Sequence, residues 1–217
     1  MCKKLLAFLL LVSLFNPGCG CLDYSMYVLA PGLRMKTVEP EYGGLEGQTV
    51  AIVIYATPKV LYEYPAVAEQ LSTNLSYELK QKVKGVKVIA PYRVLKYQQE
   101  NLFWDQKPRT ELGKQFGADY VLFVSLIEYS LREPGSIQLF RGQIVAEASL
   151  YKTSLPADQA RVWRAADLRV TFPENAPVGR PLEDNRNIGF VTQKLFAIKL
   201  VKSFYKHKVE VQEGEVS

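Results

Sequence analysis

Residues 50–55, Val-Ala-Ile-Val-Ile-Tyr, form an uninterrupted apolar run that limits the folds open to this chain more than any other segment. A strand with one solvated face alternates apolar and polar side chains, whereas a strand covered on both faces is apolar throughout. Four of these six residues are β-branched, which favours a strand over a helix. The run therefore predicts a strand that is buried on both of its faces.

The next segment predicts a loop and then a long helix. Residues 56–65 are expected to form the loop, and Pro65 suits the first turn of the helix that follows. Over 66–82 an apolar residue recurs every four positions, which places a single apolar stripe on one helical face. The stripe consists of Val67, Leu71, Leu75 and Leu79.

Residues 86–89 predict a second strand, which Pro91 ends. Residues 92–117 predict short helices, and the last of these helices begins at Pro108 and ends at Gly117. Three further strands are expected at the following ranges: 119–130, 137–151 and 162–172. Alternation of apolar and polar side chains in the later strands is typical of an antiparallel meander with one packed face.

The last helix is expected over 187–207, after a proline-containing loop at 173–186. Its apolar residues cover so wide a face that it should lie on a sheet. These residues are Val191, Leu195, Ile198, Val201 and Tyr205, widened by Phe196, Leu200 and Phe204.

The order of the expected elements predicts an α/β domain, with α+β as the alternative class. The domain should contain a mixed sheet of about five strands that starts parallel and continues as an antiparallel meander. Two long helices and several shorter ones should cover it. We expect this domain to span 49–207 and a polar tail to follow at 208–217.

The first 18 residues have the layout of a bacterial signal peptide. Lys3 and Lys4 precede an apolar run of 11 residues at 5–15, and Pro17-Gly18 follows it. About 20 helical residues are needed to span a bilayer, so this run is too short, but it suits the apolar region of a secretory signal. A buried N-terminal helix is the alternative, which the flanking lysines and Pro17 disfavour.

Cys19 and Cys21 are the candidates for lipid attachment, because each follows a glycine near the end of the apolar run. Cys19 lies closer to that run and is preferred, although Asn16 stands where a lipoprotein signal usually has leucine. An ordinary secretory signal is the alternative. All three cysteines lie within the first 21 residues, so disulfides across the domain are not expected. Residues 19–48, rich in glycine and proline, are expected to form a flexible tether to the membrane.

No set of residues in the sequence carries a recognisable catalytic or metal-binding motif. The single histidine, His207, is expected to cap the end of the last helix, where cations are favoured. Sequence spacing does not bring the carboxylates Glu63, Asp105 and Glu111 together. We therefore expect a protein that is not an enzyme and that needs no metal or cofactor. The net charge of +5 is small and scattered, which argues against nucleic acid as a partner.

Two aromatic pairs are candidates for a partner surface. Tyr62 and Tyr64 lie after the first strand, and Phe103 and Trp104 lie after the second. The carboxyl ends of strands in open α/β sheets usually form the binding edge. Aromatic residues are also enriched at protein interfaces. Local packing beneath the loops is the alternative role for all four.

Residues 111–124, Glu-Leu-Gly-Lys-Gln-Phe-Gly-Ala-Asp-Tyr-Val-Leu-Phe-Val, resemble a helix–strand element of small bacterial envelope lipoproteins. The fold of that group is like the N-terminal domain of the Tol-system translocation protein. The group includes the curli-secretion lipoprotein and the outer-membrane activator of a peptidoglycan synthase. The resemblance covers roughly 49–170. It implies a non-enzymatic protein that docks on partners or forms homo-oligomers, and among functional residues only the lipid-acceptor cysteine, Cys19, carries over.

Together these features predict a lipid-anchored protein of the bacterial cell envelope that faces the periplasm, in the outer membrane rather than the inner. It would act through protein–protein contacts in envelope assembly or secretion. A periplasmic ligand-binding or carbohydrate-active protein is one alternative, and an accessory subunit of a transport complex is another.

Overall fold

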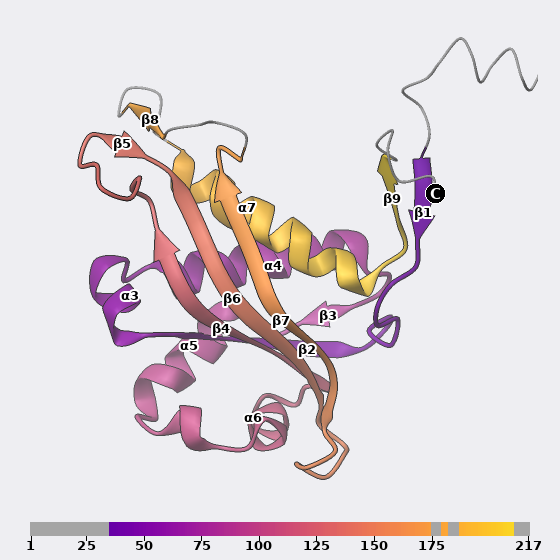
Figure 1. The fold of residues 1–217 in the computed structure, drawn as a ribbon. Coiled ribbons are helices and arrows are strands. Elements are labelled where there is room, and N and C mark those ends of the chain that lie inside the picture. Colours follow the sequence, from indigo (N-terminus) through magenta and orange to yellow (C-terminus); the bar gives the residue numbers. More distant parts are fainter. Residues whose placement is uncertain (1–34, 175–178, 182–186, 211–217) are drawn as a thin grey trace, which may run out of the picture. The chain divides into compact units, whose positions relative to one another are not determined.

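The computed structural model describes residues 35–174, 179–181 and 187–210. The chain divides into two compact units, and the larger, residues 39–207, holds the sheet and its helices (Figure 1). In the smaller unit the described residues are 35–38 and 208–210. They belong to strands β1 (Met35–Val38) and β9 (His207–Glu210), which pair as a two-stranded sheet. The expected signal peptide, Cys19, Cys21 and the first part of the expected tether lie outside the described residues.

A five-stranded mixed sheet forms the centre of the larger unit, in the order β3-β2-β4-β6-β7. Strand β2 runs parallel to β3 and β4, whereas β4, β6 and β7 form an antiparallel meander. This confirms the expected mixed sheet with a parallel start. The strands are β2 (Thr49–Ala56), β3 (Lys87–Val88), β4 (Tyr120–Ser130), β6 (Gly142–Lys152) and β7 (Arg161–Phe172).

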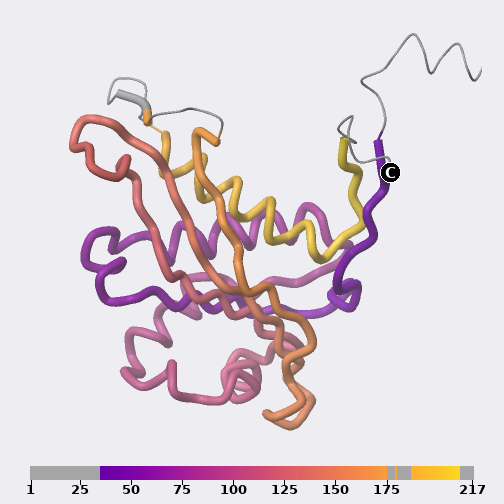
Figure 2. Tube along the Cα trace, in the orientation of Figure 1, coloured from indigo at the N-terminus to yellow at the C-terminus, as the bar shows by residue number. Residues whose placement is uncertain are grey.

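Helices cover both faces of the sheet (Figures 1 and 2). On one face lie α4 (Val67–Lys82) and α7 (Ile188–Val201), packed against each other and over the larger hydrophobic core. On the other face α5 (Pro91–Glu100), the 3₁₀ turn η1 (Trp104–Gln106) and α6 (Arg109–Phe116) cover β2 and β4 through a smaller core. Strand β2 is therefore buried on both faces, as its apolar sequence predicts.

The leucine stripe of α4 is also confirmed. Val67 is 1% exposed, and Leu71, Leu75 and Leu79 are 0% exposed. Gly117 ends α6 in the left-handed conformation, with φ of +64°. A residue with a side chain rarely adopts this angle, so the glycine makes the helix stop where the sequence predicts it.

Two prolines open helices at places where the sequence predicts a loop or the end of a strand. Pro58 begins α3 (Pro58–Glu63) inside the expected loop, and Thr57 caps it by accepting a hydrogen bond at Oγ1 from the Val60 N–H, 3.4 Å away. Pro91 likewise begins α5 directly after a strand only two residues long. Proline has a fixed φ and no N–H to lose, so it is as suitable for a helix start as for a strand end.

The structure differs from the expected tether over 39–48, because this stretch packs onto the larger unit. Leu45 is completely buried in the main core. The Glu41 carboxylate accepts hydrogen bonds from Trp163 Nε1 at 2.8 Å and from Ser203 Oγ at 3.2 Å. The glycine and proline content of the stretch therefore marks irregular but packed backbone.

The last helix is shorter than expected, and it buries a different face. It ends at Val201 and continues as a 3₁₀ turn, η3 (Lys202–Phe204). His207 begins β9, so its expected role as a helix cap is wrong. Leu195 is 39% exposed, whereas Thr192 and Gln193 are buried, which rotates the packed stripe away from the one expected.

Two short strands, β5 (Leu139–Phe140) and β8 (Arg180–Pro181), form a further two-stranded sheet, and β8 lies within the loop expected at 173–186. Among the described residues, we find no helix with both the length and the apolarity to cross a bilayer.

Candidate functional site

The corner between α3 and α4 separates two adjacent grooves at the carboxyl end of β2. The first groove has a volume of about 900 Å³ and the second about 440 Å³, and both are lined by Pro65 and Glu69 of this corner. Helix α3 lies close to the end of β2 and to the start of α4 in Figure 1. The site is thus built at the sheet edge where open α/β folds usually bind ligands.

The first groove lies between the corner, the far end of β4 and the start of α7. Its apolar walls come from Leu131, Phe140, Ile188 and Phe190, and Phe190 is 59% exposed. Glu63 also lines this groove.

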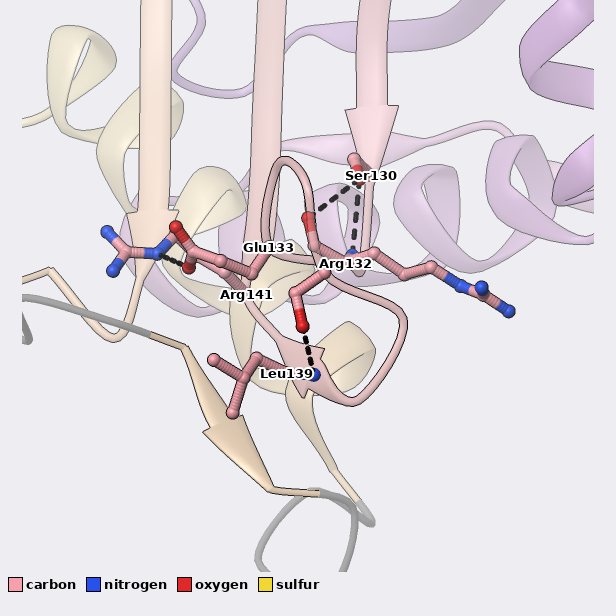
Figure 3. A network of polar contacts seen from close by, with 6 residues as sticks. Ser130, Arg132, Glu133, Leu139 and Arg141 are labelled. Atoms are coloured by element: carbon pink, nitrogen blue, oxygen red, sulfur yellow. Dashed lines mark hydrogen bonds and ion pairs between the residues drawn. The ribbon is translucent and has the colours of Figure 1, made fainter.

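Polar contacts hold the connection between β4 and β5, which supplies part of that wall (Figure 3). The Arg132 N–H donates to Ser130 Oγ at 3.2 Å, and the Leu139 N–H donates to Ser136 Oγ at 3.1 Å. Arg141 pairs with the Glu133 carboxylate across the same connection. These bonds fix the backbone on either side of the turn, so that Leu131 and Phe140 can face the groove.

Gln193, which is only 2% exposed, lies at the floor of the first groove with its amide fully engaged. Its Nε2 donates to Gln70 Oε1 and to the Tyr129 hydroxyl, both at 2.9 Å. Its Oε1 accepts from Asn74 Nδ2 at 3.3 Å. Because both N–H groups are used inside the protein, this amide is a structural part of the floor and offers no further donor to a ligand.

Two tyrosines meet edge to face at the same floor. The ring centroids of Tyr64 and Tyr129 are 4.7 Å apart, and the Tyr64 hydroxyl accepts a hydrogen bond from the Leu131 N–H at 3.3 Å. Burial raises the pKa of Tyr129, and the hydrogen bond from Gln193 partly offsets this rise. The phenol therefore stays neutral well above the pH of ordinary solutions.

The second groove lies between the corner and the α5–η1 connection. Leu61 and Leu102 line it, and they are 39% and 83% exposed. Trp104 is half-buried beside it, with its ring centroid 6.2 Å from that of Tyr55. Gln98 Nε2 donates to the Ile54 carbonyl at 3.0 Å, which holds α5 against β2.

Arg109 lies close to this aromatic layer, with its guanidinium 4.0 Å from the Phe123 ring centroid. Its Nη1 donates to the Asp105 and Lys107 carbonyls at 2.8 Å. Burial lowers the pKa of this guanidinium, and the nearby Tyr151 and Asp105 oppose the change. The arginine thereby holds η1, which contains Trp104, against the sheet.

The structure separates the four aromatic residues predicted as a partner surface into two pairs. Tyr62 is 90% exposed and Phe103 is 69% exposed, so both are open to solvent. Tyr64 and Trp104 are half-buried and pack against neighbouring aromatic rings. Sequence reasoning missed Leu61 and Leu102, although each directly neighbours a predicted aromatic residue in the chain.

The carboxylates considered in the sequence do not converge on one point. Glu63 lines the first groove and Asp105 the second, while Glu111 pairs with Lys107 at 3.2 Å. Across the part of the chain that the structure describes, no group of three or more His, Cys, Asp or Glu residues is arranged to hold a metal ion. The geometry of the grooves therefore offers apolar contact surface with acidic groups at separate places.

No protein-family model matches this chain, and no curated protein matches it in sequence. Among solved structures, it is similar to the PelC dodecamer from Paraburkholderia phytofirmans, with 13% identity and a TM-score of 0.48 over 79% of this chain and 96% of that one. Lipoprotein GNA1162 from Neisseria meningitidis shares 18% identity, with a TM-score of 0.40, over 60% of this chain and 88% of its own. The hypothetical protein CT253 from Chlamydia trachomatis shares 12% identity, with a TM-score of 0.40, over 72% of this chain and 96% of its own. With TM-scores below 0.5, these similarities transfer neither a fold nor a function to this chain.

Proposed function

We propose that this protein is a non-catalytic, lipid-anchored component of the bacterial envelope that binds another protein at the α3–α4 corner. The observation that carries the proposal is the exposure of three large side chains: Tyr62 at 90%, Leu102 at 83% and Phe103 at 69%. Leu102 lines the second groove, and Tyr62 and Phe103 directly follow the lining residues Leu61 and Leu102 in the chain. Aromatic and aliphatic side chains of this size stabilise a protein interface when a partner removes them from water.

The position of these side chains supports a binding role over a structural one. Leu102 and Phe103 lie in the connection between α5 and η1, and Tyr62 lies near the end of α3, so all three are near the edges of elements and not within a core. Each large apolar side chain buried by a partner contributes about 1.5–3 kcal/mol. A few such anchors are enough to dominate the binding free energy of an interface.

The membrane anchor is the part of the proposal that depends on the N-terminal sequence. It predicts that Cys19, or Cys21 in its place, carries lipid. In the producing organism, wild-type protein should incorporate radiolabelled palmitate and sediment with membranes. A Cys19→Ala, Cys21→Ala double variant should do neither. If the double variant remains labelled and membrane-bound, the protein is not anchored through these cysteines.

The partner surface is tested by photo-crosslinking in intact cells. A photoreactive amino acid replaces Gln99, an exposed residue that lines the second groove. The crosslinked product should disappear when Tyr62→Ser, Leu102→Ser and Phe103→Ser are combined. The matched control combines Tyr77→Ser and Tyr92→Ser, because these tyrosines are 60% and 68% exposed but line neither groove. An unchanged product in the triple variant would contradict the proposed surface.

A small-molecule ligand is the second candidate, because the first groove, at about 900 Å³, lies within the usual range for ligand sites of about 300–1,000 Å³. Native mass spectrometry of the protein purified from its own organism would detect a retained ligand as an added mass. Loss of that mass when Phe140→Ser widens the groove wall would favour this candidate. Its persistence would place the ligand elsewhere.

A further inference from the structure

We infer that the segment bound at the α3–α4 corner is a cationic peptide with apolar anchor residues, namely a stretch of the partner that combines Lys or Arg with Leu- or Phe-like side chains. This inference rests on the proposed function, since it names the chemistry of the partner that the corner would bind. Three independent features of the two grooves support it.

The first feature is the sign of the charge along the grooves. Glu63 and Glu69 line the first groove, and Glu69 and Asp105 line the second. Among the described residues that line either groove, there is no lysine, arginine or histidine. Yet the whole chain contains 27 Lys and Arg against 22 Asp and Glu. Lys59 lies on α3, but the lining of both grooves carries only acidic charge although the whole chain has an excess of positive charge. This favours a cationic partner by electrostatic complementarity.

The second feature is that two of these carboxylates are available to a partner. Glu63 and Glu69 are exposed, and neither takes part in an ion pair between described residues. Asp105 differs, because its charge acts on the half-buried Arg109. Glu69 lines both grooves, so a cationic side chain paired with Glu69 would lie between the two grooves.

The third feature is the apolar surface next to the acids. Phe140 and Phe190 lie in the first groove, and Leu61 and Leu102 lie in the second. A free cation would leave these side chains in water, whereas a peptide with alternating apolar and basic residues would cover them and reach the carboxylates as well. The same acids repel the anionic head groups of a membrane surface, which disfavours a lipid bilayer as the occupant.

The test measures binding of two labelled decapeptides to the full-length, detergent-solubilised protein by fluorescence anisotropy. One peptide alternates leucine with lysine, and the other carries glutamate at every lysine position. We expect the lysine peptide to bind at least about tenfold more tightly than the glutamate peptide. Its affinity should fall as salt is raised from low to physiological ionic strength, because exposed charge pairs are screened.

Charge variants of the corner locate the effect. Glu63→Gln and Glu69→Gln should each weaken binding of the lysine peptide by about two- to fivefold, the effect typical of a single exposed ion pair. Glu69→Lys should weaken it further and should improve binding of the glutamate peptide. The matched control is Glu46→Gln, because Glu46 is exposed, lies in the same unit and lines neither groove.

The outcomes separate this inference from the proposed function. If the two peptides bind equally, if neither binds, or if the corner variants behave like Glu46→Gln, the inference is wrong. The photo-crosslink from position 99 tests the proposed function independently of charge. A crosslink that depends on Tyr62, Leu102 and Phe103 but not on Glu63 and Glu69 would keep the docking surface and reject its cationic partner.

Discussion

At the scale of single residues, the packing of α7 on the sheet depends on a position without a side chain. A Cβ atom placed on Gly142 would lie 1.8 Å from Thr192 Oγ1 and 2.8 Å from its Cβ. Thr192 cannot move away easily, because it is 0% exposed and its hydroxyl donates to the Ile188 carbonyl at 2.7 Å. The close approach of helix and strand at this point therefore requires glycine.

We accordingly expect Gly142→Ala to lower the free energy of unfolding by about 1–3 kcal/mol, the usual effect of forcing an extra methyl group into a packed core. Urea titration followed by circular dichroism measures the change. Gly43→Ala is the matched control, since a Cβ there would meet only Pro40 Cγ at an ordinary 3.7 Å. Equal stability of Gly142→Ala and wild type would mean that α7 shifts freely on the sheet.

Single residues also show where prediction from sequence stops. The sequence predicts the apolar members of α7 as its buried stripe, but Gln193 is buried and Leu195 is 39% exposed. Gln193 can be buried because Gln70, Asn74 and Tyr129 satisfy its amide. Two of these partners lie more than 100 residues away in the chain, so no local pattern could reveal the arrangement.

At the scale of elements, the leucine-rich helix and the later strands followed from periodicity, and β2 followed from its uninterrupted apolar run. The short helix α3 did not, since one turn gives no period to detect and Pro58 suits a loop equally well. Residues 39–48 were misassigned for a related reason. Their order comes from contacts with β7 and η3 that lie far along the sequence.

The Glu41 carboxylate links this segment to both β7 and η3 through two hydrogen bonds. Glu41→Ala should lower the free energy of unfolding by about 1–3 kcal/mol, because the Trp163 N–H, on a side chain 9% exposed, would lose its acceptor. Glu41→Gln keeps an amide oxygen as acceptor and should retain part of that stability. The measurement is equilibrium unfolding in urea. If both variants were as stable as wild type, water would be replacing the carboxylate at Trp163.

At the scale of the whole molecule, the mixed sheet could be predicted from the order of the elements, but the grooves could not. The first groove combines side chains from α3, α4, β4, β5 and α7, which meet only when the sheet is assembled. Tyr62 and Phe103 were found as candidates because aromatic residues after a strand are a local signal. Leu61 and Leu102 carry no such signal.

The larger unit also has a collective response to alkaline pH. Burial is the main cause that raises the pKa of three tyrosines, Tyr42, Tyr129 and Tyr205. A hydrogen bond to Tyr120 raises the pKa of Tyr42 further. The negative charge of Glu78 does the same for Tyr205. A tyrosine in the unfolded chain loses its proton near pH 10, before these folded ones do. The unfolded state therefore binds fewer protons above pH 10, and the free energy of unfolding falls as the pH rises.

Urea unfolding between pH 8 and pH 11 should show this fall beginning near pH 10. Tyr129→Phe should make the fall less steep, because one of the three contributing phenols is removed. The comparison uses the slope with pH and not the stability at pH 8, since this variant also removes the acceptor of a Gln193 hydrogen bond. A slope equal to that of wild type would exclude Tyr129 as a contributor.

Strand β7 lies at an edge of the five-stranded sheet and is 12 residues long, so one side of its backbone is a template on which another strand could grow. Lys199 of α7 donates to the Arg169 carbonyl at 2.8 Å, and a register shift interrupts the pairing of β7 with β6 between Ala165 and Leu168. Both features discourage edge-to-edge pairing. For a protein proposed to be confined to a membrane surface, where neighbouring copies would meet in two dimensions, such an edge would disfavour strand pairing between copies and leave the α3–α4 corner accessible.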